Sequence, residues 1–172
     1  MKPLLIVDGY NVIGAWELAA RKRWAFEECR ERLTVRLEEY AAYHGCETWL
    51  VFDGTKSERR VRSMETRGAV RVVYTRHGET ADQYIERLCD EQPRHREVRV
   101  ATNDSVEQLV ILGRGAARVP ARELLREMEQ AQDAQRARIG PPAVKRDLLI
   151  HRLPKEQAEA LEKMRRGVHE GD

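Results

Sequence analysis

Four aspartates follow short apolar runs that are typical of buried strands. Asp8 ends LLIVD, Asp53 ends CETWLVFD, Asp104 comes just after EVRVAT, and Asp82 opens a helical stretch after AVRVVYT. Because the carboxyl ends of parallel strands meet at one edge of a sheet, we expect these carboxylates to converge there. Crowded carboxylates raise one another's pKa, and a divalent cation relieves that repulsion. Oxygen ligands favour Mg²⁺ or Mn²⁺, which can hold a phosphate oxygen and activate water for phosphodiester hydrolysis.

Each aspartate also has a purely structural interpretation. Asp8 and Asp53 precede glycine and could form tight turns, whereas Asp82 and Asp104 could be helix N-caps. The catalytic interpretation rests on all of the acids together, because unrelated caps and turns seldom converge on one sheet edge.

Short polar side chains accompany the acids. Asn11 could orient a water or a phosphate oxygen, or it could cap a helix that begins at Val12. The remaining candidates for supporting hydrogen bonds, or for plain caps, are Thr80, Thr102, Asn103 and Ser105.

A basic segment follows the second strand. Between residues 56 and 76 there are seven Lys and Arg residues against two Glu, in a chain whose net charge is only +2. We expect this segment to form a flexible loop over the acidic edge, where cations would contact a nucleic-acid backbone. A solvated charge run is the alternative. The residues predicted to bind RNA are Lys56, Arg59, Arg60 and Arg62.

The pattern of elements predicts an α/β fold. Apolar β-rich runs lie at residues 4–8, 46–53, 69–75, 97–102 and, more weakly, 116–121. Segments with helical spacing lie between them, at 23–43, 80–89 and 105–112. Alternating strands and helices indicate βαβ crossovers and a mainly parallel sheet with helices on both faces.

The chain beyond residue 121 is more polar. RELLREMEQAQDAQRAR predicts an exposed helix, and Gly140-Pro141-Pro142 then breaks the chain. A last short helix is predicted from Pro154. We therefore divide the chain into a domain at 1–138 and a helical C-terminal tail at 139–172.

Several classes of protein lack their usual sequence features here. The three cysteines, Cys29, Cys46 and Cys89, show no zinc-ligand spacing. No apolar run approaches the ~20 residues of a membrane span, and the N-terminus lacks the pattern of a signal peptide, so we expect a cytoplasmic protein without a membrane partner. Phosphate-binding loops, dinucleotide fingerprints, serine-hydrolase elbows and zinc-protease helices are all absent from the sequence.

Four motifs in order resemble those of a known family. DGYN at 8–11, VFDG at 51–54, GETADQYIE at 78–86 and ATNDSVEQ at 101–108 are similar to the successive motifs of NYN-domain proteins. The YacP-like branch, within the PIN-like nuclease superfamily, is the best match, from about residue 2 to about residue 130. Asn103 stands where many relatives have serine, and its amide still offers hydrogen bonds.

This resemblance implies a three-layer α/β/α domain with a metal-dependent ribonuclease site. By position, Asp8, Asp82 and Asp104 match the acidic metal-binding residues of the family. Asn11 matches the asparagine of the first motif and Asp53 the acid after the second strand. The family is linked to endonucleolytic cleavage of mRNA on the ribosome, so mRNA and the ribosome are expected partners.

The sequence therefore predicts a metal-dependent endoribonuclease that uses Mg²⁺ or Mn²⁺ to hydrolyse single-stranded RNA. Two alternatives remain open at this point. A non-catalytic RNA- or ribosome-binding module would keep the fold and the basic segment. A phosphatase for small phosphate esters would use the acids and would not need the basic segment. The sequence gives neither the preference between RNA and DNA nor the oligomeric state.

Overall fold

The computed structural model describes residues 1–54, 62–104 and 115–139. The chain divides into two units, Met1–Gln135 and Arg136–Asp172, and the fold described here is that of the first unit. The helix predicted at 105–112 and the chain from residue 140 onward lie outside the described residues.

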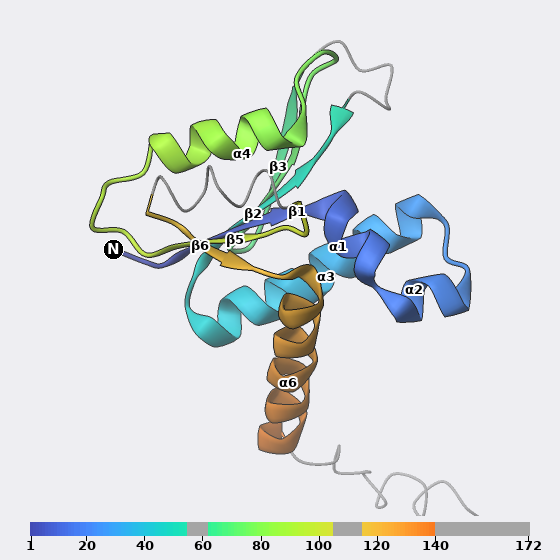
Figure 1. Ribbon diagram of the computed structural model, residues 1–172. Coiled ribbons are helices and arrows are strands. Elements are labelled where there is room, and N and C mark those ends of the chain that lie inside the picture. The colour runs from blue at the N-terminus through green and yellow to red at the C-terminus, as the bar shows by residue number, and fades with distance from the viewer. Residues whose placement is uncertain (55–61, 105–114, 140–172) are drawn as a thin grey trace, which may run out of the picture. The chain divides into compact units, whose positions relative to one another are not determined.

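A six-stranded sheet forms the centre of this unit, in the order β3-β4-β2-β1-β5-β6 (Figure 1). All neighbouring strands are parallel except the antiparallel pair β3 and β4. The predicted α/β class with a mainly parallel sheet is therefore confirmed. The strands are β1 (Leu4–Asp8), β2 (Glu47–Phe52), β3 (Ser63–Arg67), β4 (Val70–Tyr74), β5 (Val98–Ala101) and β6 (Ala117–Val119).

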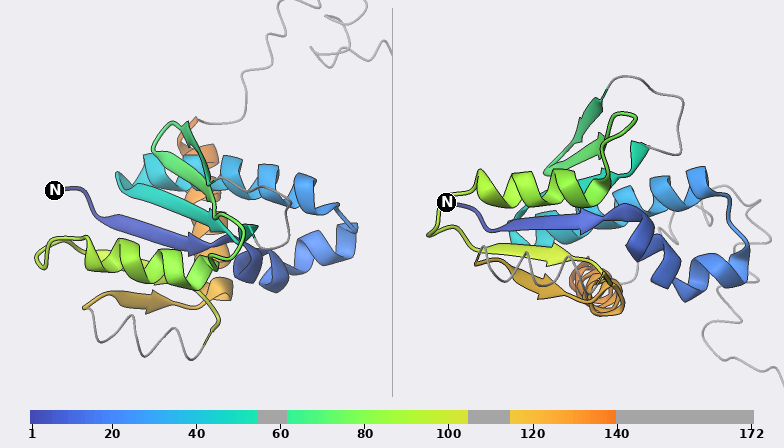
Figure 2. Two further views of the ribbon diagram at one scale, coloured as in Figure 1. Left: turned by 90° about the horizontal axis from the view of Figure 1, so that it is seen from above. Right: turned by 45° about the horizontal axis from the view of Figure 1, so that its top comes forward.

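Helices cover both faces of the sheet. Helix α4 lies on one face, whereas α1, α3 and α6 lie on the other, and α2 follows α1 (Figures 1 and 2). The helices are α1 (Gly9–Ala15), α2 (Glu17–Lys22), α3 (Phe26–His44), α4 (Ala81–Asp90) and α6 (Ala121–Ile139). The predicted helical segments at 23–43 and 80–89 correspond to α3 and α4. Among the described residues, no helix is long and apolar enough to cross a membrane.

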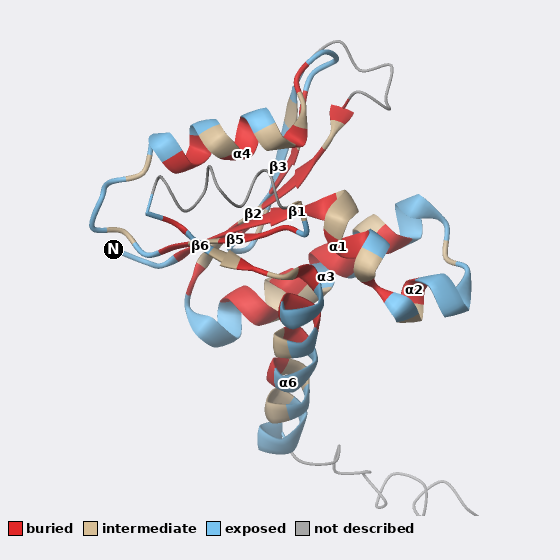
Figure 3. Ribbon diagram, viewed as in Figure 1, coloured by how far each residue is buried: buried red, intermediate tan, exposed pale blue. Residues whose placement is uncertain are grey.

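Strand β1 is buried along its whole length because it lies between β2 and β5 and is covered on both faces. Its side chains alternate between the two layers. Leu5 and Val7 pack in the cluster that contains α3, whereas Leu4 and Ile6 pack in the cluster that contains α4. A strand in this position has an almost unbroken apolar sequence. Figure 3 shows the resulting band of buried residues through the sheet.

The prediction of a flexible loop after β2 was wrong for residues 63–67, which form strand β3. Ser63–Arg67 pairs antiparallel with β4 and forms the outer strand of the sheet. None of its residues is buried, so its sequence carries no apolar alternation. The strand is formed by backbone pairing with the edge of β4 and by ion pairs of Arg67 with Glu31 and Glu38. Neither interaction is visible in a hydrophobic pattern.

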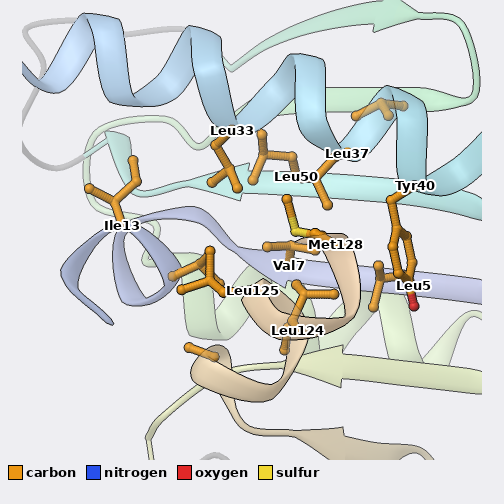
Figure 4. Close-up of a cluster of buried hydrophobic side chains, with 14 of the residues drawn as sticks. Leu5, Val7, Ile13, Leu33, Leu37, Tyr40, Leu50, Leu124, Leu125 and Met128 are labelled. Atoms are coloured by element: carbon orange, nitrogen blue, oxygen red, sulfur yellow. The ribbon is translucent and has the colours of Figure 1, made fainter. Parts of the chain in front are cut away.

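The prediction that the helix after residue 121 is exposed was wrong, because one side of α6 is buried. Leu124 and Met128 lie beside Val7, Leu37 and Leu50 in the core (Figure 4). The side chain of Leu124 is completely buried. The buried positions of α6 follow helical spacing and are Ala121, Leu124, Leu125, Met128 and Ala131. The many charged residues between them made the segment look exposed throughout.

Truncation of Leu124 tests whether α6 belongs to the core. Leu124→Ala should lower the free energy of unfolding by about 2–5 kcal/mol, because it removes a fully buried side chain and leaves a cavity. Glu129→Ala, on the exposed side of the same helix, should change it by less than about 0.5 kcal/mol. Denaturant unfolding followed by circular dichroism measures both. Equal, small effects would mean that α6 contributes nothing to the stability of the domain.

Candidate functional site

The carboxyl edge of the sheet carries all four predicted aspartates. Asp8 is the last residue of β1 and Asp53 directly follows β2. Asp82 lies in the first turn of α4, and Asp104 follows β5. Strands β1, β2, β4 and β5 are parallel neighbours, so their carboxyl ends share this edge. The structure therefore brings together acids that lie far apart in the sequence.

The aspartates are close enough to perturb one another. Burial is the main reason why the pKa of Asp8 lies above its usual value, and Asp53 and Asp104 raise it further. Hydrogen bonds from Asn11 act in the opposite direction. Burial also raises the pKa of Asp82, followed by the charges of Asp8, Asp104 and Asp53. The edge is thus a concentration of negative charge that favours a cation.

The donor set suits a hard divalent metal ion. It consists of carboxylate and amide oxygens, which Mg²⁺ and Mn²⁺ prefer. Across the described ranges, no three His, Cys, Asp or Glu side chains form a group that could hold a metal ion by themselves. Mg²⁺ usually keeps several waters and takes only one or two carboxylates from the protein, so these residues fit such an ion. Ligation by Asp8, Asp82 and Asp104 stays a prediction.

Asp8 has a structural role as well as its place among the acids. It is 4 % exposed and it is the N-cap of α1, where Oδ1 accepts from the Asn11 backbone N–H at 3.3 Å. Its Oδ2 accepts from Asn11 Nδ2 at 2.8 Å. Helix α1 begins at Gly9, so Asn11 lies inside it and is not the cap of a helix that begins at Val12. The strand ends on a carboxylate that also starts the next helix.

A chain of hydrogen bonds continues from Asn11 to the start of α6. Asn11 Oδ1 accepts from the backbone N–H of Asn103 at 3.3 Å. Asn103 Oδ1 then accepts from the backbone N–H of Ala121 at 3.0 Å. Asn103, predicted as a supporting residue, thereby joins the loop after β5 to the first turn of α6. The completely buried Thr102 accepts from the backbone N–H of Asp104 at 3.1 Å.

Asp82 is positioned by the N-terminus of α4. Thr80, and not Asp82, is the N-cap, and it forms a capping box with Gln83. Asp82 lies in the first turn, where the helix dipole favours a negative charge. Thr80, predicted as a supporting residue or a plain cap, is thus a cap, and the Thr-x-x-Gln spacing is the sequence pattern of such a helix start.

A buried threonine that sequence analysis missed ties two of the acid-bearing loops together. Thr75 Oγ1 accepts from the backbone N–H of Gly54 at 2.8 Å and donates to the backbone carbonyl of Glu79 at 2.7 Å. Gly54 follows Asp53, and Glu79 precedes the cap of the helix that carries Asp82. A Cβ atom on Gly54 would lie only 1.6 Å from the Thr75 carbonyl oxygen. Glycine at this position is therefore required by the close approach of the two backbones.

Glu79 is a second residue that sequence analysis missed. Its side chain is 7 % exposed and forms ion pairs with Arg62 and Arg87, in which Nη2 of each arginine lies 2.7 Å from Glu79 Oε1. Both guanidinium groups also lie over the ring of Tyr84, at 4.8 and 5.0 Å from its centroid. Burial raises the pKa of Glu79, but hydrogen bonds from Arg62 and Arg87 outweigh it, so the pKa lies below its usual value. Two positive charges thus stabilise this carboxylate in its ionised form.

The basic segment is only partly described. Lys56, Arg59 and Arg60, like Ser105, lie outside the described residues. Arg62 is described, and its guanidinium is bound to Glu79. Contact of these four cations with RNA stays a prediction, in which Arg62 would contribute less because a carboxylate already neutralises it.

A family model, YacP-like NYN domain, matches residues 5–166. The chain belongs to the YacP-like NYN domain family. The resemblance carried by the four sequence motifs is therefore confirmed.

Relatives cover nearly the whole chain. It is 37% identical over 166 residues to the uncharacterized protein YacP of Bacillus subtilis (strain 168). The aligned region covers 95% of this chain and 97% of YacP. A crystal structure of Rae1 (YacP) from Bacillus subtilis matches with a TM-score of 0.68 at 37% identity, over 97% of this chain and 96% of that one. The crystal structure of a mutant of the same protein matches with a TM-score of 0.64 at 33% identity, over 94% of this chain and 99% of that one. Membership of this family supports a nuclease-like function related to RNA.

Replacement of Thr75 tests whether its two hydrogen bonds hold the acid-bearing loops together. Thr75→Val keeps the shape of the side chain but removes both of its hydrogen bonds, so the free energy of unfolding should fall by about 1–3 kcal/mol. Thr75→Ser keeps the hydroxyl group and should recover most of that loss. Chemical denaturation measures both variants. Equal stability of Thr75→Val and the wild type would show that these hydrogen bonds do not hold the loops.

The pH dependence of stability tests the burial of Asp8. Because its pKa is raised in the folded state, folding binds a proton, and the contribution of Asp8 is most favourable below its unfolded pKa. Stability is lost as pH rises from there through the raised, folded pKa. Asp8→Asn cannot ionise, so in chelator-treated buffer it should become more stable than the wild type over this interval. Parallel stability curves for the two proteins would contradict the raised pKa.

Proposed function

We propose that this protein is a metal-dependent endoribonuclease that hydrolyses phosphodiester bonds in single-stranded RNA. The observation that carries the proposal is the convergence of Asp8, Asp53, Asp82 and Asp104 at one sheet edge, where burial, followed by the charges of neighbouring aspartates, raises the pKa of Asp8 and Asp82. Such an edge is suited to a divalent cation, and the YacP-like NYN family supplies the RNA-related context. We further propose mRNA as the substrate and the ribosome as the place of cleavage.

Each residue has a defined part in this proposal. Asp8, Asp82 and Asp104 would hold Mg²⁺ or Mn²⁺, directly or through the waters that such an ion keeps, and the ion would supply Lewis acidity and activate water. Asn11 holds the Asp8 carboxylate through its side-chain amide and so fixes the direction of a ligand oxygen. Asp53 adds negative charge that strengthens cation binding.

The basic segment would bind the substrate backbone. Lys56, Arg59 and Arg60 would contact phosphates on either side of the scissile bond, and such contacts weaken with increasing salt. They would carry no sequence preference, because phosphates are the same at every position.

Cleavage of long single-stranded RNA with Mn²⁺ tests the proposal. EDTA should abolish cleavage, and Asp8→Asn and Asp82→Asn should each reduce it about 100-fold or more, because each removes charge that a metal ion needs. The matched control is Asp133→Asn, which changes an exposed aspartate on α6 and should leave the rate unchanged. Cleavage that persists in both site variants would refute the assignment of the site.

Two further arms separate the alternatives. The same assay on translating ribosomes tests whether the substrate must be presented there. Binding to RNA without cleavage in either setting, and unaffected by Asp8→Asn, would identify a binding module. Hydrolysis of small phosphate esters that charge reversal at Arg59 and Arg60 leaves unchanged would identify a phosphatase.

A further inference from the structure

A pocket of about 480 Å³ adjoins the acidic edge. It lies within the range of roughly 300–1,000 Å³ that is typical of ligand sites. Its lining comes from α1, from the loop after β5 and from the first turn of α6. The lining residues are Tyr10, Asn11, Gly14, Ala15, Asn103 and Arg122.

The pocket is joined to the acids by Asn11. This side chain lines the pocket and also donates from Nδ2 to Asp8 Oδ2 at 2.8 Å. Asn103, whose backbone N–H donates to Asn11 Oδ1 at 3.3 Å, also lines the pocket and is followed directly by Asp104. A ligand in the pocket would therefore lie next to the predicted metal-binding residues.

Three kinds of group line the pocket. Tyr10 supplies an aromatic ring that packs edge-on against Phe52 and Phe26, with centroids 5.2 and 6.0 Å away, so its position is fixed. Asn11 and Asn103 supply amides. Arg122 supplies the only charge in the described lining. An aromatic ring, amides and a guanidinium are the groups with which proteins bind unpaired nucleotides.

Arg122 is well placed to accept an anionic partner. Its side chain is 74% exposed, and its ion pair with Glu17 spans 3.7 Å between two largely exposed groups. Exposed pairs of this kind contribute little to stability, so a phosphate can replace Glu17 as partner at small cost. The positive charge also offsets repulsion between a phosphate and the neighbouring aspartates.

Gly14 keeps the pocket open. It is exposed near the end of α1, and a Cβ atom added there would meet nothing within 4 Å. Its φ is outside the range that favours glycine, so neither the backbone nor the packing requires glycine at this position. Glycine inside a helix costs roughly 0.5–1 kcal/mol relative to alanine. A residue that lowers helix stability here leaves space that a side chain would fill.

We propose that this pocket binds one nucleotide of a single-stranded RNA, adjacent to the phosphate that is cleaved. The base lies against Tyr10 with its edge toward Asn103, and a flanking phosphate binds Arg122. This assignment rests on the proposed function for the position of the scissile phosphate, but nucleotide binding itself can be measured without cleavage.

The test uses a fluorescent oligouridylate with EDTA present, so that no metal-dependent cleavage occurs. Gly14→Leu fills the pocket, and the dissociation constant should rise about 10-fold, the effect expected for loss of one stacked base. Its control is Ala42→Leu, which adds bulk at an exposed position of α3 outside the pocket. Fluorescence anisotropy measures both. An unchanged dissociation constant in a folded Gly14→Leu variant would overturn the proposal.

The contact between Arg122 and phosphate has its own signature. Arg122→Ala should weaken binding and reduce the slope of log K against log salt by about 1, because one phosphate contact is lost. Arg94→Ala removes an equivalent exposed charge outside this pocket and should leave the slope unchanged. Equal slopes in both variants would remove Arg122 from the site.

Chemical-shift mapping keeps the test independent of the variants' folding. Titration of the ¹⁵N-labelled wild-type protein with the oligouridylate should shift the backbone amides of Tyr10, Ala15 and Asn103 first. Shifts confined to other surfaces, or none at all, would overturn the pocket. Pocket shifts without metal-dependent cleavage, both of free RNA and on translating ribosomes, would refute the proposed nuclease while the nucleotide site stands. Cleavage by Gly14→Leu with wild-type KM would refute the pocket while the nuclease stands.

Discussion

The site is built around a carboxylate that ends the most buried strand of the sheet. Strand β1 has neighbours on both sides and helices on both faces, so Asp8 at its end is only 4 % exposed. A buried carboxylate must be hydrogen-bonded or paired with a cation. Asn11 meets part of this requirement with two hydrogen bonds, whereas the neighbouring aspartates increase it. The remaining need for positive charge is the physical basis of the proposed metal dependence.

Parallel pairing alone brings the acids to one edge, but it does not fix the loops that carry them. The structure does this with short hydrogen bonds between backbone and small side chains. Thr75 joins the loop after β2 to the segment before α4, and Thr80 caps α4 itself. Asn103 joins the loop after β5 to α6. These contacts hold the loops near the acids without adding charge, which would otherwise compete with a metal ion.

Helix α6 has two roles in this domain. Leu124 and Met128 complete the core beneath the sheet (Figure 4), whereas Arg122, exposed in its first turn, lines the pocket beside Asn11. The same helix start is held by Asn103. Packing of α6 therefore places the guanidinium-bearing residue Arg122 next to the acidic edge. The proposed metal site and the proposed nucleotide site are therefore side by side, as a nuclease that acts on unpaired RNA would need.

The sequence by itself determined the parallel sheet and its central strands, because burial on two faces imposes a continuous apolar run. It also placed the four aspartates at one sheet edge, because Asp8 and Asp53 directly follow such runs and Asp82 and Asp104 lie in the segments that follow two others. It also determined the family, since the four motifs are local. Strand β3, the buried side of α6 and the pairing of Glu79 with Arg62 and Arg87 were decided only by the tertiary structure. The hydrogen bond from Asn103 to Asn11 joins residues 92 positions apart. Such contacts depend on which surfaces meet after folding, and no local periodicity encodes them.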